Sequence, residues 1–508
     1  MKAVLISMPD VTPIMIHERA IHMPNHGIAC VAGNVDEGHD VFIIDLNRKR
    51  SSIKKYLTKH LGKIRPDIVG LSSMTWQFET CMKIIRLVKS LLPDVKIVIG
   101  GYHATLMYES IAESPDAGDI DFIVRGEGEE PFRRLMNALA GNDTFEDIPS
   151  LSYKKDGEFV HNDRGPNLNL AKLKMPVRDK RRLTWGYHSM FSRVELMETS
   201  RGCTRDCNFC SINHMYGRSY RTYSIERILA DLDYLYIKKK AQWVFIVDDN
   251  MVLNPKWVIQ VCEAIADRKY KGLNLVVQAD CVSMAKNPEM VRKMAEAGFK
   301  SVFMGIENGS EKNLATMNKG NIVDEAKRAI ENCHNNGIMV IAGLIFGLPE
   351  DSEQEIIENY EFYKFLEADT SYLQMLTPYP RTRIREELLK RNLVTNKNDF
   401  QWYNGLWANV RTKYLTSEQL QYFFWLHRQK VMGWWEPSTF AMERGGAWVR
   451  VWKYAIRPFM KFFYERKTRR LGWEGRYKDE MLRLRLMNVF PDLEEYSRKS
   501  SSVRWEWD

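Results

Sequence analysis

The sequence of 508 residues contains no apolar run of eighteen or more residues, which is the length that a membrane-spanning helix requires. Its first residues, Met1 to Met8, form a short apolar segment that becomes polar too soon for a secretory signal peptide. We therefore expect a cytoplasmic protein. Apolar residues make up 44% of the chain, which is enough for globular folding, and the length predicts two or three domains.

Cysteine is scarce, at eight residues, and five of the eight occur singly inside apolar segments. These five are Cys30, Cys81, Cys262, Cys281 and Cys333. A secreted disulfide framework would instead show paired cysteines in loops, so we interpret the five as buried thiols. Their scatter also argues against a second metal cluster, which would need a group of cysteines of its own.

Internal repeats and low-complexity tracts are absent as well, and the positive charge is not spread evenly. The net charge is +9, and residues 441–486 hold 13 Lys and Arg against 5 Asp and Glu. No recognisable nucleic-acid-binding fold or grouped basic motif accompanies this charge, so we expect no nucleic-acid partner.

Residues 1–145 alternate short apolar runs with amphipathic ones. Runs typical of buried strands are residues 2–7, 41–45, 68–72 and 97–100, and helical patterns cover residues 27–37 and 80–92. Continuous apolar strands separated by helices predict a parallel sheet that is covered on both faces. We therefore expect an N-terminal doubly wound α/β domain of the flavodoxin or Rossmann type.

Ligands of such domains bind at the carboxyl ends of the strands, where this sequence has small and hydrogen-bonding residues. The candidates are Ser72, Ser73, Thr75, Gly100, Gly101, His103, Gly126 and Glu127. Loops of this composition let a ligand approach the backbone closely.

Residues 146–192 are polar and rich in turn-forming residues, and we interpret them as a linker. From residue 193 a second series begins, with strand patterns at residues 244–247, 273–278, 301–306, 338–346 and 372–376. We expect a second βα domain over residues 193–390, followed by a mostly helical region over residues 391–508.

Three cysteines near the start of this second series have the spacing C-x3-C-x2-C: Cys203, Cys207 and Cys210. Three thiolates can hold three irons of a [4Fe-4S] cluster and leave the fourth iron open to a ligand other than protein. Zinc is the alternative, but it would need a fourth ligand, for which His214 is poorly spaced. The motif resembles the signature of the radical S-adenosylmethionine (SAM) enzymes, in which an aromatic residue, here Phe209, precedes the third cysteine.

This resemblance covers about residues 193–385 and implies an open, partial (β/α)6 barrel that binds SAM. Residues 343–350 are similar to the family's G-x-I-x-G-x-x-E pattern, and polar residues stand where other strands should end. The candidates for contacts with SAM are Phe209, Asp248, Asp249, Gln278, Asp280, Glu307, Gly343, Ile345, Gly347 and Glu350. Residues 377–382 resemble the family's T-P-x-P-G-T exit, with Arg381 in place of the glycine.

The N-terminal region resembles the cobalamin-binding domain that precedes many radical SAM cores. Two motifs carry the resemblance: Gly-Gly-x-His at residues 100–103 and Arg-Gly-Glu-Gly-Glu at residues 125–129. It departs from the D-x-H-x-x-G pattern by which some cobalamin proteins provide a histidine to cobalt, because no glycine follows His39 at the required position. We therefore expect cobalamin to bind without a protein histidine on cobalt. The lower face of cobalt would then be open or covered by the loop of residues 74–76.

The chain beyond residue 420 holds eight of the fourteen tryptophans, at positions 425, 434, 435, 448, 452, 473, 505 and 507. Apolar residues from Trp448 to Phe463 recur at helical spacing among basic ones, and Pro458 is expected to kink the helix. Two interpretations remain open. One is a lid over the barrel mouth, which the kink and the mixed polarity favour, and the other is a peripheral contact with an anionic membrane surface.

Together the resemblances imply an enzyme with three cofactors: a [4Fe-4S] cluster, SAM and cobalamin. Reductive cleavage of SAM would give a 5′-deoxyadenosyl radical that activates a C–H bond, and our first hypothesis is subsequent methyl transfer from methylcobalamin to a hydrophobic substrate carbon. The second is an oxidative cyclisation or rearrangement of a tetrapyrrole, because the layout also resembles the anaerobic magnesium-protoporphyrin monomethyl ester cyclases. A cobalamin or redox sensor is the third hypothesis.

As partners we expect a small-molecule substrate, either a lipid such as a polyprenoid or a tetrapyrrole, and an external one-electron reductant such as flavodoxin or ferredoxin. A methylthiotransferase is disfavoured. That family needs three further cysteines in its N-terminal domain, and here only Cys30 and Cys81 are present.

Overall fold

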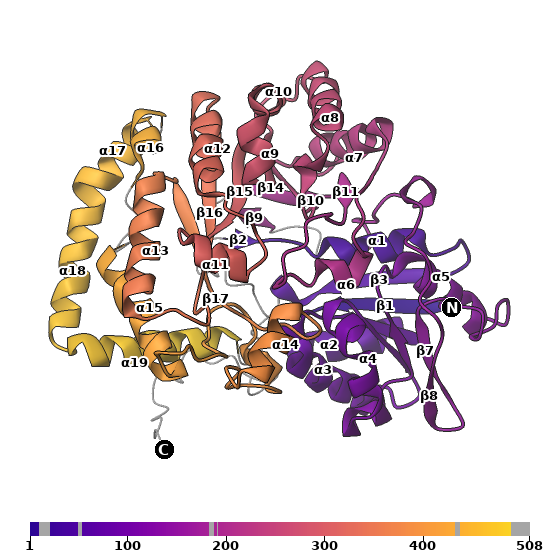
Figure 1. Ribbon diagram of the computed structural model, residues 1–508. Coiled ribbons are helices and arrows are strands. Elements are labelled where there is room, and N and C mark those ends of the chain that lie inside the picture. Colours follow the sequence, from indigo (N-terminus) through magenta and orange to yellow (C-terminus); the bar gives the residue numbers. More distant parts are fainter. Residues whose placement is uncertain are drawn as a thin grey trace. The chain divides into compact units, whose positions relative to one another are not determined.

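The computed structural model describes residues 1–9, 21–48, 53–181, 187–189, 192–431, 437–444 and 446–488 (Figure 1). The chain divides into two compact units, one centred on residues 22–187 and the other on residues 188–484. No helix among the described residues is both long and apolar enough to cross a membrane.

The first unit is built on a seven-stranded sheet with the order β3-β1-β4-β5-β6-β7-β8. Five of its strands are parallel, namely β1 (Lys2–Ser7), β3 (Asp40–Asp45), β4 (Ile68–Ser72), β5 (Lys96–Gly100) and β6 (Phe122–Val124). Counted along the chain, this is the flavodoxin-like order 2-1-3-4-5, in which the direction of strand addition reverses between β1 and β4. The predicted doubly wound α/β fold is confirmed.

Helices cover both faces of this sheet (Figure 1). One core includes side chains of α1 (His26–Asn34) and α5 (Glu129–Leu139), and the other includes side chains of α2 (Ile53–Ile64), α3 (Phe78–Leu91) and α4 (Tyr102–Ala112). In β1, Ala3 and Leu5 belong to the first core, whereas Val4 and Ile6 belong to the second. The strand is apolar at every central position because both of its faces are buried.

Residues 151–161, within the segment expected to form a linker, instead contribute two strands to the first unit. β7 (Leu151–Lys155) and β8 (Glu158–His161) extend the sheet as an antiparallel hairpin. Its turn, Asp156-Gly157, has positive φ at both positions, as type I′ turns do. Further on, the Lys180 carbonyl accepts a hydrogen bond from the amide of Ile43 in β3 at 3.0 Å. Part of the predicted linker therefore forms the edge of the first unit's sheet.

The second unit is built on an eight-stranded sheet with the order β17-β16-β15-β14-β13-β10-β9-β2. Six consecutive strands are parallel, namely β10 (Ser192–Met197), β13 (Trp243–Ile246), β14 (Asn274–Asp280), β15 (Phe299–Glu307), β16 (Met339–Phe346) and β17 (Thr370–Met375). The short strands β9 (His188–Ser189) and β2 (Ile21–His22) complete one edge. The predicted six-stranded partial barrel is confirmed.

Helices connect the parallel strands and lie on one side of them (Figure 1). They include α7 (Ile225–Ile237), α8 (Pro255–Asp267), α9 (Cys281–Lys286), α10 (Pro288–Glu296), α12 (Val323–Asn335) and α13 (Glu353–Leu366). In β15, Val302 and Met304 are fully buried, whereas the alternating residues Phe303 and Gly305 are half-buried. The half-buried residues therefore lie on the inner face of the open barrel, whose carboxyl-terminal end is where barrel enzymes place their active sites.

The described part of the remaining chain is mostly helical, as predicted. Its helices are α14 (Arg383–Lys390), α15 (Ser417–Val431), α16 (Thr439–Arg444), α17 (Gly446–Val451), α18 (Arg457–Arg469) and α19 (Gly472–Asn488). Residues Trp452–Ile456 form a π-helical turn just before Pro458. Proline lacks an N–H and its ring crowds the carbonyl four residues earlier, so the irregularity expected at Pro458 takes the form of this wider turn. Trp434, Trp435, Trp505 and Trp507 lie outside the described residues.

Candidate functional site

The three cysteines of the C-x3-C-x2-C motif lie on the loop between β11 (Ser200–Arg201) and α6 (Ile212–Tyr216), beyond the carboxyl end of β10. Their thiols are free and half-buried. All three belong to the described residues, and the loop between β11 and α6 holds no fourth cysteine. The donor set therefore fits a cluster of several irons better than a lone zinc ion. Burial raises the pKa of Cys210 to about 12, so metal binding has to displace its proton.

A buried carboxylate fixes the segment that leads into this cysteine loop. Asp248, 1% exposed, accepts hydrogen bonds from the Thr199 amide at 2.7 Å and from the Ser200 hydroxyl at 2.6 Å. The Thr199 hydroxyl donates to the same carboxylate. Burial raises the pKa of Asp248 to about 6. Because its carboxylate is enclosed by these groups, Asp248 positions the loop, whereas the sequence suggested a contact with SAM.

Asp249 holds the first turn of the cysteine loop. Its carboxylate accepts the Gly202 amide at 2.9 Å. Gly202 has a φ of +86°, and a Cβ atom there would come within 2.3 Å of the Ser219 carbonyl oxygen, so only glycine fits. Asp249 is half-buried, and burial raises its pKa to about 6. This carboxylate is thus placed next to the cysteines while one side stays accessible.

Asp280 and Asn250 join the cysteine loop to two neighbouring strand ends. Asp280 accepts hydrogen bonds from Arg205 at 2.7 Å and from the Asn250 side-chain amide at 3.1 Å. The same amide lies 3.9 Å from the Cys203 sulfur, within hydrogen-bonding range for sulfur. The structure therefore brings Asp249, Asn250 and Asp280 together around the first cysteine.

Glu307 ends β15 in an unusual conformation, with a φ of +70° and a register shift against β16. Its carboxylate forms a largely buried ion pair with Lys319 at 2.9 Å. Burial raises the pKa of the Cys207 thiol, and the nearby Lys319 ammonium opposes this rise. Sequence reasoning missed Lys319. The segment Met317-Asn318-Lys319-Gly320 lies between two helical patterns, and its polar residues could have indicated Lys319 as a candidate.

The G-x-I-x-G-x-x-E segment forms the end of β16 and the turn after it. The Gly347 amide donates to Asp351 at 2.9 Å, and the Ile345 carbonyl accepts the side-chain amide of Asn359 at 3.2 Å. Asp351 is 2% exposed. Glu350, the acid of the pattern, instead pairs with Arg391 at 2.7 Å. The carboxylate that shapes this turn is therefore that of Asp351, and the structure does not turn Glu350 toward the strand.

Aromatic and small residues share the inner face of the barrel with these polar groups. The rings of Phe303 and Tyr372 meet edge-on at 5.8 Å between centroids, and a Cβ atom on Gly343 would lie 2.9 Å from the Phe303 ring. The side chain of Gln278 is exposed on β14, opposite Phe303 in the register. Sequence reasoning missed Phe303 and Tyr372, because apolar residues in a strand carry no motif.

In the first unit the candidate ligand loops follow β4, β5 and β6. The His103 amide donates to the Ser73 carbonyl at 3.3 Å, and the Gly126 amide donates to the Thr105 hydroxyl at 2.9 Å. A Cβ atom on Gly101 would lie 2.8 Å from the Ser73 carbonyl oxygen. Glycine at this position therefore allows the loops after β4 and β5 to approach each other closely. Ser72, Ser73 and Thr75 therefore lie at the strand-order reversal, where ligands of this fold bind.

This edge of the sheet suits a large cofactor with many hydrogen-bonding groups. Ser72, Gly100, Gly101 and Gly126 are half-buried, whereas Ser73 and Thr75 are buried. The Glu127 carboxylate accepts a hydrogen bond from the Leu168 amide at 2.8 Å. This bond holds the segment around Leu168 next to the loop after β6. The hydroxyl groups and the glycine backbone at this edge can form hydrogen bonds with the amide groups around the ring of cobalamin.

Neither candidate histidine is well placed to bind cobalt. His39 precedes β3, at the amino ends of the strands, and hydrogen-bonds Asn137 at 3.0 Å. His103 is 2% exposed and packs on Phe78, with 4.3 Å between ring centroids. Burial lowers the pKa of His103 to about 3, so its imidazole is neutral. In the loop after β4, the Met74 side chain is exposed and Trp76 is buried.

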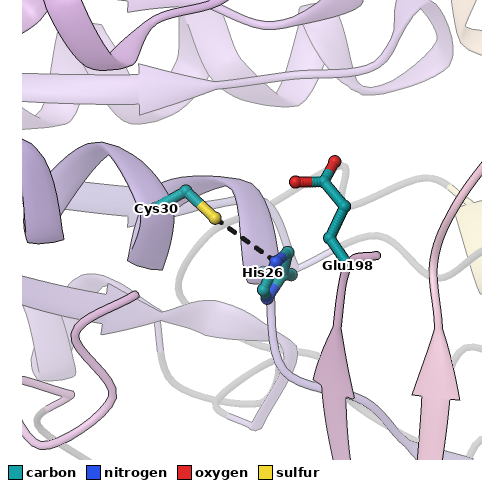
Figure 2. A group of neighbouring side chains, drawn as sticks. All are labelled: His26, Cys30 and Glu198. Carbon is teal, nitrogen blue, oxygen red and sulfur yellow. Dashed lines mark hydrogen bonds between the residues drawn. The ribbon is translucent and has the colours of Figure 1, made fainter. Parts of the chain in front are cut away.

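One further pair was not singled out by the sequence. Figure 2 shows the imidazole of His26 beside the thiol of Cys30, one turn apart on α1, with 3.3 Å between Nε2 and Sγ. Both side chains are buried, as predicted for Cys30. Figure 2 also labels Glu198, which in the second unit accepts hydrogen bonds from Arg201 at 2.9 Å and Tyr223 at 3.0 Å.

Comparisons with known proteins agree with this geometry. Residues 13–136 match the family described as B12 binding domain, and residues 197–363 match the Radical SAM superfamily. An uncharacterised methyltransferase of Pyrococcus horikoshii is 28% identical over 444 residues, which cover 87% of this chain and 94% of that protein. The anaerobic magnesium-protoporphyrin IX monomethyl ester cyclase of Rubrivivax gelatinosus is 26% identical, over 76% of this chain and 70% of its own.

A solved structure shares the fold. The radical SAM methyltransferase TsrM of Kitasatospora setae, with cobalamin and a [4Fe-4S] cluster bound, superposes with a TM-score of 0.64 and 16% identity. The match covers 77% of this chain and 75% of that one.

The two matched families define the class of this protein: an enzyme that joins a cobalamin-binding domain to a radical SAM core. The chain belongs to the cobalamin-binding radical SAM enzymes. Its predicted cofactors, a [4Fe-4S] cluster, SAM and cobalamin, are thereby confirmed.

We predict that electron paramagnetic resonance of the Co(II) form will show no nitrogen splitting from a protein imidazole, because His39 lies at the wrong end of the sheet and His103 is buried. Substituting His39→Ala should leave the signal unchanged. A nitrogen triplet that disappears when either histidine is replaced by alanine would contradict this prediction.

Proposed function

We propose that this chain is a radical methyltransferase that places a methyl group on an unactivated carbon of a hydrophobic small molecule. The observation that carries the proposal is the cysteine loop, which offers three free thiols in a chain that also has a B12-binding domain. When bound, the open cluster cleaves SAM reductively and cobalamin supplies the methyl group. The test is the fate of SAM, because methyl transfer requires both 5′-deoxyadenosine and S-adenosylhomocysteine.

The residues of the site take distinct roles in this proposal. Cys203, Cys207 and Cys210 hold the cluster. Asp249, beside the cysteine loop, suits the ammonium group of SAM, because a carboxylate forms the stronger, charge-assisted hydrogen bonds. In this arrangement Gly343 and Ile345 offer β16 backbone to the adenine, and Gln278 is placed for the ribose.

The inner face of the barrel supports a hydrophobic substrate. Phe303 and Tyr372 line it from two strands, and Gly343 between them adds no side chain of its own. Flat or aliphatic molecules bury well against aromatic rings. A lipid such as a polyprenoid or a tetrapyrrole therefore fits this surface better than a sugar.

The second candidate is an oxidative cyclisation or rearrangement of a tetrapyrrole, which the similarity to the anaerobic cyclase favours. It uses the same cysteine loop and differs in the step after hydrogen abstraction. A sensor role is disfavoured, since a sensor has no use for an open iron.

Either reaction needs electrons from outside the chain. Among the described residues the remaining five cysteines are buried and stand on separate elements, so they form no second cluster site that could relay electrons. A small one-electron donor such as flavodoxin or ferredoxin fits this requirement.

A contact with an anionic membrane surface is also part of the proposal, and it rests on α17, α18 and the π-helical turn between them. Trp448 is 76% exposed, Tyr454 70% and Phe459 63%. Residues 446–470 contain eight Lys and Arg and one acidic residue, Glu465. Exposed aromatic residues among cations are typical of helices that lie in a membrane interface.

The attachment of α16 does not support the alternative of a lid. The Ser438 hydroxyl donates to Asp369, which also pairs with His334 at 2.9 Å, and the Phe440 ring stacks on His334 at 4.3 Å. Asp369 directly precedes β17, and His334 lies in the last turn of α12, before β16 begins. These contacts lie at the amino ends of the strands, whereas the cysteine loop lies at the carboxyl ends.

We predict that the full chain will sediment with phosphatidylglycerol vesicles and not with pure phosphatidylcholine vesicles. The double variant Lys453→Gln and Lys461→Gln should bind about thirty-fold more weakly, since each cation near an anionic surface contributes about 1 kcal/mol. A matched control is Phe365→Ala, because Phe365 is an exposed aromatic residue on α13. Equal sedimentation of the double variant and the native chain would contradict the contact.

A further inference from the structure

The second cysteine of the motif, Cys207, is held through the residues on either side of it. On one side the Asp206 carbonyl accepts the side-chain amide of Asn318 at 2.7 Å. On the other side Asn208 donates twice, from its backbone amide to the Met317 carbonyl at 3.1 Å and from its side chain to the Thr316 carbonyl at 2.6 Å. Both neighbours of the cysteine are thus tied to one short segment, residues 316–319, which we name the 316–319 turn.

The 316–319 turn is the C-terminal end of α11 (Glu311–Thr316). A helix leaves its last carbonyl groups without partners in the helix, and here Asn208 satisfies two carbonyls beyond the last full turn. Asn318 has a φ of +54°, a left-handed conformation that asparagine tolerates better than other residues with a side chain. Its backbone amide donates to the Ala315 carbonyl at 3.0 Å. The turn is therefore formed by the helix's own backbone.

The start of α14 supports the cysteine loop from another direction. The Ile384 amide donates to the Asn208 carbonyl at 3.1 Å, and Arg383 forms an ion pair with Asp206 at 2.9 Å. Asp206 and Asn208 therefore each have partners in two places, the 316–319 turn and the start of α14. The backbone around Cys207 is determined by bonds that do not involve its sulfur.

We propose that Asn208 and Asn318 are positioning residues that preset the backbone at Cys207 for the [4Fe-4S] cluster. The inference rests on the proposed function, because it takes Cys207 as a cluster ligand. Without these side chains the three thiols remain, but the loop samples more conformations and holds the cluster less firmly. The expected consequences are faster loss of iron and an altered environment of the reduced cluster.

The test compares iron release in three variants of the full chain after anaerobic reconstitution: Asn208→Ala, Asn318→Gly and the control Asn321→Ala. Glycine keeps the left-handed turn and removes only the amide of Asn318. Asn321 is exposed on the same connection and bonds Glu311, not the cysteine loop. Transfer of iron to an excess of an iron(II) chelator should be about five-fold faster in the first two variants, the factor expected for one lost hydrogen bond.

Electron paramagnetic resonance of the reduced cluster provides a second readout. The signal should change in Asn208→Ala and Asn318→Gly and stay native in Asn321→Ala. Native release rates and a native signal in Asn318→Gly would overturn the proposal, and this variant decides the matter if Asn208→Ala fails to fold. Failure of the native chain to bind iron at all would count against the proposed function, which separates the two outcomes.

Discussion

Replacing Cys203, Cys207 and Cys210 together with alanine is expected to remove essentially all bound iron and the visible absorbance of the cluster. The three thiols are the only cysteines on the loop beyond β10, and Asp248, Asp249 and Asp280 fix the backbone around them. The native chain, reconstituted anaerobically, should bind about four irons, the content of one [4Fe-4S] cluster. Iron content and absorbance of the same samples check both expectations.

The matched control for this prediction is Cys262→Ala. Cys262 is a buried thiol of α8 in the same barrel, so its loss removes a cysteine without touching the loop. This variant should keep its iron. About eight irons in the native chain would show that a second cluster exists and that the single-cluster interpretation is wrong.

The sequence predicted the elements well because hydrophobic periodicity follows directly from burial. β1, β4 and β16 end at the residues where their apolar runs end, and each lies inside a sheet covered by helices. The hairpin of β7 and β8 escaped the same reasoning. β7 is short, and the edge strand β8 is largely exposed, so the polar composition of β8 is the same as that of a linker.

The candidate site was predicted at the level of motifs and less well at the level of single side chains. Motifs pointed to the cysteines and to glycines such as Gly101, where a positive φ and the nearby Ser73 carbonyl leave no room for a side chain. Spacing could not tell Asp248, which is enclosed, from Asp249, which stays half-buried. The same limit applies to Glu350 and Asp351, because adjacent residues point in different directions and a sequence does not show which one turns inward.

Contacts between distant segments were out of reach of the sequence. Asn318 is more than a hundred residues from Asp206, and its role depends on the left-handed end of α11. Neither position carries a motif of its own. Polar residues at the ends of helices are common, and only the fold shows which of them meet a functional loop.

The fate of SAM is expected to separate methyl transfer from cyclisation. With reductant, a candidate lipid or tetrapyrrole, and SAM that carries a deuterated methyl group, a methyltransferase should form both 5′-deoxyadenosine and S-adenosylhomocysteine and should label the product. One SAM is cleaved to the nucleoside, and a second is demethylated when cobalamin is methylated again. Mass spectrometry of the nucleosides and of the product measures all three outcomes in one reaction.

A cyclase or rearrangement would form 5′-deoxyadenosine with an unlabelled product and no S-adenosylhomocysteine, and that result would replace our first hypothesis with the second. The triple cysteine variant is the matched control, because it keeps the B12-binding domain but should form no 5′-deoxyadenosine and no methylated product. Phe303→Ala distinguishes substrate binding from SAM chemistry: the ring lies on the inner face, whereas the cysteine loop is held by other residues. We expect this variant to lose about ten-fold in apparent substrate affinity, since truncating a buried aromatic contact costs on the order of 1.5 kcal/mol, and to keep its bound iron.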